Sequence, residues 1–273
     1  MNALLGEKLS IVTPKAQTTR HRIMGILNGD DYQVVYSDTP GVLDPKYKLH
    51  EGMMKAVGSA LSDADLLLVV IDSNDKHPFH PATLEKIKQI KTPVFVVLNK
   101  FDLVGREGSN VLFEWWNKEL PEAKIFPVSA TEKIYTKELL EEILDVLPLS
   151  PPYFPKDEVS DRSMRFFISE IIREKIFMNY EREIPYSCEV VIEEFKDEPD
   201  IIRIGSVIMT ERESQKRILI GHQGSMLKRV GTSARKDIES FVGKKVFLQM
   251  FVKVEENWRN NLGRLKSFGY WEQ

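Results

Sequence analysis

The chain has very little of several features that mark other classes of protein. Cys188 is the only cysteine in 273 residues. A disulfide framework and a thiolate metal site are therefore excluded, and we expect this thiol to pack as a small apolar group. The longest apolar runs, such as residues 66–71, are too short to span a bilayer, and no charged-then-apolar leader is present. We expect a cytoplasmic protein without redox chemistry.

The net charge of the chain is also small, although one segment carries a large excess of positive charge. The net charge is −3 at pH 7, and 29% charged and 42% hydrophobic residues are ordinary for a soluble globular chain. Residues 1–155 carry 17 Lys and Arg against 21 Asp and Glu, whereas residues 212–245 carry nine against three. A basic segment of this kind is typical of a phosphate-rich partner, but a solvated lysine-rich face has the same composition.

Proline marks a division of the chain. Pro148, Pro151, Pro152 and Pro155 interrupt the regular patterns on either side of them, as in a semi-rigid linker. Because 273 residues exceed the usual size of one domain, we predict a first domain at 1–150, a linker at 151–163 and a second domain at 164–273.

In the first domain, apolar runs typical of buried strands alternate with helical patterns. We expect strands at 32–37, 64–72, 94–98 and 125–128, and helices at 46–61, 80–91, 108–119 and 136–147. This βαβ series predicts an α/β fold around a largely parallel sheet, with ligands bound at the carboxyl ends of the strands. The pattern of residues 1–6 predicts the end of a helix, with Leu4 and Leu5 facing the core and Gly6 at its end.

The first candidate motif is Asp38-Thr39-Pro40-Gly41, which follows the first predicted strand. The Asp38 carboxylate can reach Mg²⁺ through water, and Gly41 can bring its backbone N–H to a γ-phosphate. These residue types are also common in a plain strand-ending turn. Val42 follows, where some GTPases place a glutamine that orients the attacking water. Hydrolysis should therefore be slow and depend on backbone groups, the metal, a monovalent cation or a partner.

The second candidate motif is Asn99-Lys100-Phe101-Asp102, directly after the strand at 94–98. Asp102 can accept two hydrogen bonds from guanine that adenine cannot offer. Asn99 would brace the loop, the Lys100 stem would lie over the base, and Ser129-Ala130 would offer a backbone N–H to the guanine oxygen. A polar loop is the alternative, but motifs in order at successive strand ends favour a guanine-nucleotide site.

Residues 13–22 form a polar, basic stretch between apolar segments. Such a stretch is typical of a mobile loop that orders over Mg²⁺ and the γ-phosphate, and either Thr18 or Thr19 would meet the metal. An ordinary basic surface loop is the alternative, and we expect His21 to be structural. No glycine-rich phosphate loop of the form G-x-x-x-x-G-K-[ST] occurs between Met1 and Asp38, so a segment that precedes Met1 is expected to carry it.

The second domain contains Gly221-His222-Gln223-Gly224, between a predicted apolar strand at 217–220 and a predicted helix at 225–241. The glycines let the backbone approach a sugar-phosphate chain, and the helix N-terminus favours phosphates. Further charge nearby comes from Lys228, Arg229, Arg235 and Lys236. A G-x-x-G tetrapeptide alone is common by chance. Together with a helix at 165–182 and strands at 189–195, 203–211 and 246–255, the order is that of an RNA-binding K-homology (KH) domain of type II.

Aromatic residues gather near the end of the sequence. Trp258, Phe268, Tyr270 and Trp271 could stack on RNA bases, but packing of this end of the chain is the favoured interpretation.

Together these segments resemble the Era family of GTPases over the whole chain. The resemblance is carried by the two motifs, the G-x-x-G segment and residues 8–12, 16–22, 172–175 and 183–187. It implies a Ras-like P-loop GTPase domain, here without its first strand and phosphate loop, followed by an α+β type II KH domain. It also implies GTP and Mg²⁺ as ligands, and the 3′ end of 16S rRNA and the small (30S) ribosomal subunit as partners in ribosome assembly. We further expect a monomer that binds no DNA and associates peripherally with the inner face of the cell membrane.

The departure from the family lies at the start. The family's first strand stands in the middle of the sheet, so its absence should expose apolar edges, and without the phosphate loop we expect no GTP hydrolysis from the sequence as it stands. One alternative is a nucleotide-independent RNA-binding chaperone with a degenerate GTPase domain. Another is a GTPase that acts on tRNA modification, which the G-x-x-G segment disfavours.

Overall fold

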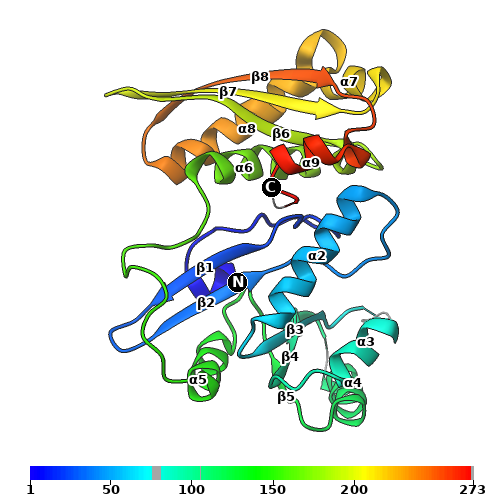
Figure 1. Ribbon diagram of the computed structural model, residues 1–273, viewed down its shortest axis with the longest axis vertical. Coiled ribbons are helices and arrows are strands. Elements are labelled where there is room, and N and C mark those ends of the chain that lie inside the picture. Colours follow the sequence, from blue (N-terminus) through cyan, green and yellow to red (C-terminus); the bar gives the residue numbers. More distant parts are fainter. Residues whose placement is uncertain (76–80, 105, 272–273) are drawn as a thin grey trace. The chain divides into compact units, whose positions relative to one another are not determined.

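The computed structural model describes residues 1–75, 81–104 and 106–271. Its chain divides into two compact units, shown as ribbons in Figure 1. The first unit comprises Met1–Lys8, Gly25–Ser37 and Gly58–Val159, and the second comprises Leu9–Met24, Asp38–Val57 and Ser160–Gln273. Because this division by contacts does not follow chain order, the domain boundaries predicted from the sequence stay a prediction.

From β2 onward the first half of the chain alternates strands and helices as expected, whereas strand β1 was not predicted. Its elements are α1 (Asn2–Leu5), β1 (Ile23–Asn28), β2 (Gln33–Asp38), α2 (Lys48–Ser62), β3 (Leu67–Asp72), α3 (Pro81–Lys88), β4 (Val94–Asn99), η1 (Phe101–Leu103), α4 (Arg106–Glu119), β5 (Lys124–Pro127) and α5 (Thr136–Val146). Residue 80, where one predicted helix begins, lies outside the described residues.

The predicted largely parallel sheet is found in two parts. Within the described residues, β3, β4 and β5 form a three-stranded sheet in that order with parallel pairing, and β1 and β2 form a separate two-stranded sheet. Val70 on β3 is 60% exposed, which is the exposed apolar edge that the sequence predicts. The division into two parts agrees with the expected absence of the family's middle strand, because no described strand joins β2 to β3.

Strand β4 is buried on both faces, as its unbroken apolar run predicts. Its side chains alternate between two apolar clusters, since successive residues of a strand point to opposite faces. Val96 and Leu98 join the cluster that includes Trp116 of α4, and Phe95 and Val97 join the cluster that includes α5.

The short helix α1 packs as predicted. It ends at Gly6, whose φ of 78° is readily adopted only by glycine, and Leu4 and Leu5 pack against the α5 cluster.

The second half contains an α+β arrangement around one sheet. Its elements are α6 (Met164–Asn179), η2 (Pro185–Ser187), β6 (Glu189–Asp197), β7 (Ile201–Thr210), α7 (Glu213–Ile220), η3 (His222–Gly224), α8 (Ser225–Val242), β8 (Lys245–Val254), η4 (Trp258–Asn260) and α9 (Leu262–Ser267). Strand β7 pairs antiparallel with β6 and parallel with β8, and within the described residues the strand order is β6-β7-β8.

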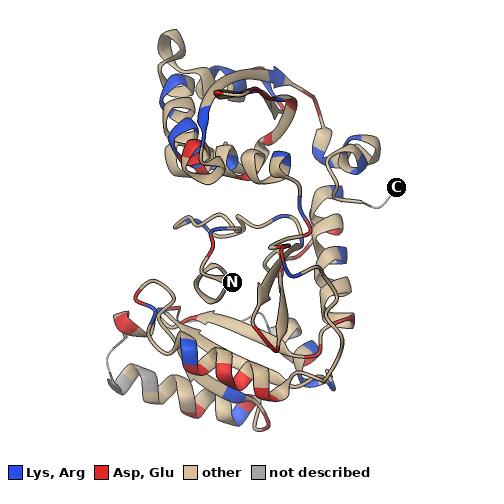
Figure 2. Cartoon of the chain, turned by 90° about the vertical axis from the view of Figure 1, so that its left-hand side faces the viewer, with Lys and Arg blue, Asp and Glu red and all other residues tan. Residues whose placement is uncertain are grey.

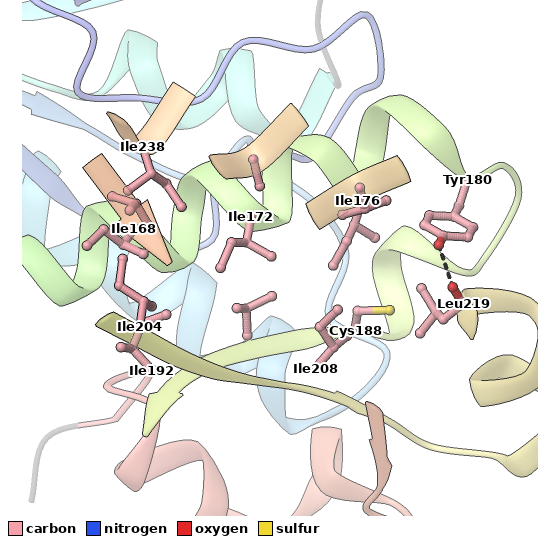
Figure 3. Close-up of a cluster of buried hydrophobic side chains, with 14 of the residues drawn as sticks. Ile168, Ile172, Ile176, Tyr180, Cys188, Ile192, Ile204, Ile208, Leu219 and Ile238 are labelled. Carbon is pink, nitrogen blue, oxygen red and sulfur yellow. Dashed lines mark hydrogen bonds between the residues drawn. The ribbon is translucent and has the colours of Figure 1, made fainter. Parts of the chain in front are cut away.

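An apolar core lies between α6, α8 and one face of this sheet. Helix α6 contributes Ile168, Ile172 and Ile176 at a spacing of four residues, which places them on one side of the helix. Helix α8 contributes Val230, Ala234 and Ile238 in the same way, and β7 contributes Ile204 and Ile208. Figure 3 shows this cluster together with Tyr180, whose hydroxyl donates a hydrogen bond to the carbonyl of Leu219 at 2.6 Å.

The strand predicted at 217–220 is wrong. These residues form the second half of helix α7, and the G-x-x-G segment therefore joins two helices. The helix begins because the Gln215 side chain accepts hydrogen bonds from the backbone N–H groups of Glu211 and Arg212, both at 3.0 Å. Leu219 is fully buried while Ile218 is 50% exposed, as expected of a helix with one face on the core.

Cys188 packs as a small apolar group, as predicted. It is fully buried, and its Sγ–H donates to the carbonyl of Ile184 at 3.0 Å. Burial raises the pKa of this thiol to about 12. We therefore expect the folded protein to remain unmodified by a maleimide at pH 8, because the thiolate is the reactive form. One equivalent should react in urea, as measured by mass spectrometry, and rapid labelling of the folded chain would contradict this placement.

Candidate functional site

The second candidate motif lies at the carboxyl end of β4. Lys100 turns the chain with a φ of 59°, and Phe101 begins the short helix η1 that carries Asp102. The backbone N–H of Phe101 donates to the carbonyl of Val128 at 3.2 Å. This contact ties the loop after β4 to the loop after β5. Asp102 is therefore exposed on a loop whose first residues are held in place by a hydrogen bond.

Asn99 makes the bracing contact that its position predicts. Its Oδ1 accepts a hydrogen bond from the backbone N–H of Ala130 at 3.0 Å. The N–H of Ser129 donates to the carbonyl of Ile134 at 3.2 Å. The backbone N–H groups of Ser129 and Ala130, from which the sequence assigns one to a guanine oxygen, are thus both hydrogen-bonded within the protein, and that assignment stays a prediction.

Lys100 does not stand free. Its Nζ lies 2.6 Å from Oδ2 of Asp72, which ends the neighbouring strand β3. Burial raises the pKa of Asp72, but the hydrogen bond and charge of Lys100 and the N–H of Asn74 outweigh it and lower that pKa. Sequence reasoning missed Asp72, although the parallel strands predict that it lies beside Asn99. The pair fixes the end of the Lys100 side chain beside Asp72, at the carboxyl edge of the sheet.

The first candidate motif follows β2. Oδ2 of Asp38 accepts a hydrogen bond from the Ser10 hydroxyl at 2.5 Å. Burial is the main reason why the pKa of Asp38 is raised. Its carboxylate is therefore partly satisfied by the protein, whereas Gly41 and Val42 are exposed and Pro40 is buried.

The magnesium ligands Asp38, Thr18 and Thr19 stay a prediction. Thr18 and Thr19 are half-buried, and among the residues that the structure describes no three His, Cys, Asp or Glu side chains gather closely enough to hold a metal ion by themselves. The predicted site differs from such a cluster, because it combines one carboxylate and threonine oxygens with the phosphates of the nucleotide.

The segment at 13–22 is irregular, as predicted, but it is bound tightly within the second unit. Lys15 Nζ donates to the carbonyls of Phe177, at 2.9 Å, and Tyr180, and lies 3.1 Å from Glu181. The Tyr186 hydroxyl donates to the carbonyl of Ala16 at 3.2 Å. The loop is thus anchored to the end of α6 and to η2.

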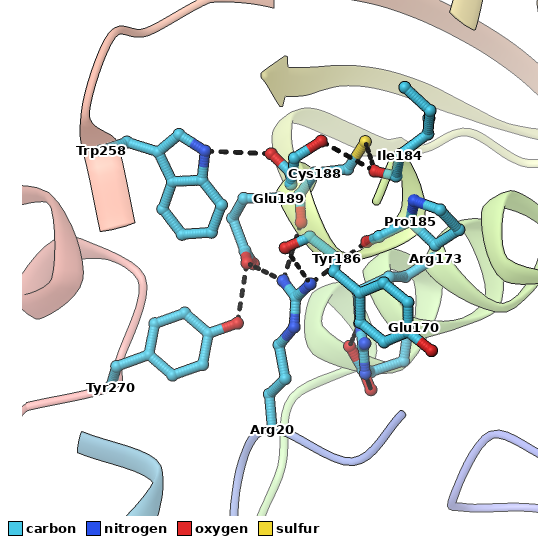
Figure 4. A network of polar contacts seen from close by, with 11 residues as sticks. Arg20, Glu170, Arg173, Ile184, Pro185, Tyr186, Cys188, Glu189, Trp258 and Tyr270 are labelled. Atoms are coloured by element: carbon cyan, nitrogen blue, oxygen red, sulfur yellow. Dashed lines mark hydrogen bonds and ion pairs between the residues drawn. The ribbon is translucent and has the colours of Figure 1, made fainter. Parts of the chain in front are cut away.

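Arg20 is the centre of this anchoring (Figure 4). The side chain is only 3% exposed, and it donates to the carbonyls of Cys188, Pro185 and Tyr186 at 2.7, 3.2 and 3.0 Å. It also pairs with Oε2 of Glu189 at 3.2 Å. A guanidinium suits this position because its planar fork can satisfy several acceptors at once.

The acceptor of that ion pair is shared. The Tyr270 hydroxyl donates to the same Glu189 oxygen at 2.7 Å, and the His21 ring stacks on Tyr270 with centroids 4.1 Å apart. Burial raises the pKa of Glu189 and lowers that of His21. His21 is therefore a structural side chain, as expected from the sequence.

The aromatic residues near the end of the sequence pack against the protein, as the favoured interpretation holds. Trp258 is fully buried, and its Nε1–H donates to the carbonyl of Ser187 at 3.1 Å. Tyr270 is 8% exposed, and Phe268 and Trp271 pack against the same cluster.

The G-x-x-G segment forms the turn between α7 and α8. Gly221 and Gly224 have φ values of 71° and 77°, and Gln223 between them also has a positive φ of 48°. At Gly221 a Cβ would lie 2.7 Å from Met226 Cγ, whereas at Gly224 it would meet nothing within 4 Å. Gly221 is thus required by packing as well as by conformation.

A groove of about 370 Å³ begins at this turn and runs between α8 and β8. Its lining residues are Gly224, Leu227, Lys228, Gly231, Thr232, Arg235, Leu248 and Met250. The lining combines the apolar side chains of Leu227, Leu248 and Met250 with the cationic side chains of Lys228 and Arg235. The groove offers an apolar surface for bases next to cations for phosphates.

The predicted basic residues lie on α8, whose Lys and Arg are blue in Figure 2. Lys228, Arg229 and Lys236 are exposed. Arg235 is half-buried and forms an ion pair with Glu239 at 2.9 Å. His222 and Gln223 are exposed within the turn itself. The structure thus brings all eight predicted RNA contacts to one helix and the turn that precedes it.

Family models match both halves of the chain. Residues 1–100 match a family described as "50S ribosome-binding GTPase", and residues 183–259 match the KH domain. GTPase Era of Lacticaseibacillus paracasei is 41% identical over 272 residues, which cover 99% of this chain and 91% of that protein.

The chain belongs to the Era family of GTPases. The chloroplastic ERA-like GTPase of Arabidopsis thaliana is 43% identical over 280 residues, and the match spans 98% of this chain but only 64% of the plant protein. A crystal structure of Era with MgGDPNP and nucleotides 1506–1542 of 16S ribosomal RNA has a TM-score of 0.92 at 36% identity and covers 98% of this chain and 92% of the other. A variant of Aquifex aeolicus Era bound to GDP and AlF₄⁻ has a TM-score of 0.93, again at 36% identity, with coverages of 98% and 93%.

Membership of the Era family explains why the two halves differ so much in architecture, since a Ras-like GTPase domain is followed by a KH domain. No described helix of this Era-family chain is both long and apolar enough to cross a membrane.

Proposed function

We propose that this chain binds guanine nucleotides and the 3′ end of 16S rRNA, and that it acts on the small ribosomal subunit during its assembly. The observation that carries the proposal is the groove between α8 and β8 with the G-x-x-G turn at its end. The Era solved with nucleotides of 16S ribosomal RNA resembles this chain over nearly its whole length, which supports the choice of RNA.

Nucleotide binding belongs to the same proposal. Asp102 is exposed on a loop that Asn99 and Ala130 brace, and a relative of high similarity was solved with MgGDPNP. We propose that Mg²⁺ binds together with the nucleotide, and that GTP is hydrolysed where the domain includes the phosphate loop expected ahead of Met1. We also propose a cytoplasmic monomer that binds no DNA and associates peripherally with the membrane.

The direct test titrates labelled 3′-terminal 16S RNA and a labelled GTP analogue into the full chain, each with and without the other ligand. The proposal requires saturable binding of both and displacement of the analogue by GTP but not ATP. RNA binding that is identical at every nucleotide concentration, with no analogue bound, would favour the nucleotide-independent chaperone instead.

Gly224→Asp should weaken RNA binding about tenfold or more. Asp tolerates the left-handed conformation better than most residues, and there is open space for its Cβ, so the fold should persist. Its carboxylate would face the phosphates that the turn and Lys228 attract.

Gly243→Asp is the matched control. Gly243 ends the same helix with a φ of 66°, and a Cβ at this position would also meet nothing within 4 Å, but the residue lies outside the groove lining. Fluorescence anisotropy should give wild-type affinity for this control. Equal affinities for the two variants would remove the G-x-x-G turn from the RNA site.

A further inference from the structure

The sheet of the second unit has a face turned away from its apolar core. On β8, Val246 is buried in that core and Leu248 and Met250 line the groove. The residues between them alternate to the opposite side, here named the outer face and defined by Arg203 on β7 and by Lys245, Phe247, Gln249, Phe251 and Lys253 on β8. The pairing register places Arg203 beside Phe247 and Val207 beside Phe251.

Two phenylalanine rings stand in solvent on this face. Phe247 is 44% exposed and Phe251 is 59% exposed, whereas phenylalanine is usually among the most buried residues. The guanidinium of Arg203 lies 5.5 Å from the centre of the Phe247 ring. Four residues of extended strand separate the rings by about 13 Å, so they would hold bases that are not adjacent in sequence.

The charge around the rings is positive. Lys245 and Lys253 are exposed at the two ends of the row, and neither has an ion-pair partner within the part of the chain that the structure describes. Two acidic side chains nearby are paired, Glu198 with Arg203 at 3.0 Å and Glu194 with Lys196. Lys245 and Lys253 therefore flank the two rings with positive charge, which complements a phosphate chain.

The outer face is also continuous with the groove. Within the described residues β8 has β7 on one side and no strand on the other, so only the thickness of one strand separates Met250 in the groove from Phe251 outside. A chain that leaves the groove over this edge reaches the rings directly.

We propose that the outer face of β8 is a second RNA-binding surface, on which Phe247 and Phe251 stack unpaired bases of the strand that leaves the groove. Aromatic side chains on an open sheet face, flanked by cations, stack bases in other RNA-binding folds, and such stacking tolerates any base sequence. The inference rests on the proposed RNA binding and extends its footprint from the groove to the sheet.

The test compares two single-stranded RNAs on the full chain by fluorescence anisotropy. The short one, of about five nucleotides, only fills the groove beside the G-x-x-G turn, and the long one is about three times that length. The wild-type chain should bind the long RNA at least about tenfold more tightly, because each base that stacks on a ring adds to the affinity. Phe247→Leu with Phe251→Leu should lose that gain and leave the short RNA unaffected.

The replacement series separates stacking from other uses of the face. Tyr at both positions should restore the tighter binding of the long RNA, because its ring also stacks on bases. If the contact were only apolar, the Leu variant would already keep the tighter binding. Leu262→Ala removes a 44% exposed apolar side chain from α9 and should change nothing. If the long RNA gains nothing in the wild-type chain, or if the Leu variant keeps the gain, the outer face is not an RNA surface and a protein partner becomes the occupant to seek. Failure of the short RNA to bind would instead refute the groove.

Discussion

Replacing Arg20 by alanine should destabilise the second unit by about 3–5 kcal/mol, the usual loss when one partner of a buried ion pair is removed. Glu189 would keep its burial and its hydrogen bond from Tyr270 but lose its cation, and the carbonyls of Pro185, Tyr186 and Cys188 would lose their donor. Urea unfolding followed by circular dichroism measures the loss, and amide exchange assigns it to the second unit.

Two variants and a pH series sharpen this test. Lys46→Ala removes an exposed cation of the same unit and should leave the free energy of unfolding nearly unchanged. Arg20→Lys should lower that free energy by less than Arg20→Ala does, but it should still lower it, because one ammonium cannot satisfy four acceptors. In the alanine variant the pKa of Glu189 should rise further, so its folded state binds a proton more readily than the unfolded chain. The difference in unfolding free energy between the wild-type chain and Arg20→Ala should then become smaller as the pH falls toward the usual pKa of a glutamate. A neutral effect of Arg20→Ala at pH 7 would contradict the buried network.

Asp102→Asn is expected to lower affinity for GTP by at least about 100-fold, since an unpaired hydrogen-bonding group in a specific site discriminates by several orders of magnitude. The carboxylate of Asp102 can accept from both donors on guanine. The amide of asparagine has one acceptor and one donor. Its NH₂ group would therefore face one of the two N–H donors of guanine, and that hydrogen bond would be lost. Xanthine has an oxygen where guanine has its amine, and the variant should therefore prefer xanthosine triphosphate.

Isothermal titration calorimetry with GTP and with xanthosine triphosphate measures the two affinities and shows which nucleotide each variant prefers. Asp65→Asn, at an exposed position of the first unit, is the matched control and should bind GTP as the wild-type chain does. An unchanged GTP affinity in Asp102→Asn would place the base elsewhere. RNA binding should be unaffected in both variants, since neither residue belongs to the second unit.

The parts of the structure that the sequence predicts well are those with a local cause. The apolar run from Val94 to Leu98 is a buried strand, and the polar residues after it do lie at its carboxyl end. The helical spacing of Ile168, Ile172 and Ile176 is likewise a core face. In each case residues close together in sequence decide the outcome.

The failures have causes that the sequence pattern does not contain. The short apolar run that ends at Ile220 suits a strand or a turn of helix equally well, and the decision comes from the Gln215 side chain, which caps the helix through two backbone groups. The burial of Arg20 was equally unpredictable, because its acceptors lie more than 160 positions later. A basic residue in a polar loop gives no local sign of such partners.

The buried network around Glu189 also constrains the order of events during synthesis. Glu189 follows Arg20 by 169 positions, and Tyr270 follows Glu189 by a further 81. Since chains leave the ribosome from the N-terminus at about 5–20 residues per second, the segment around Arg20 waits at least several seconds for its acceptors and longer for the residue that completes the network. Until then its apolar neighbours Leu9, Ile11 and Ile23, all buried in the finished chain, are open to whatever binds nascent polypeptides.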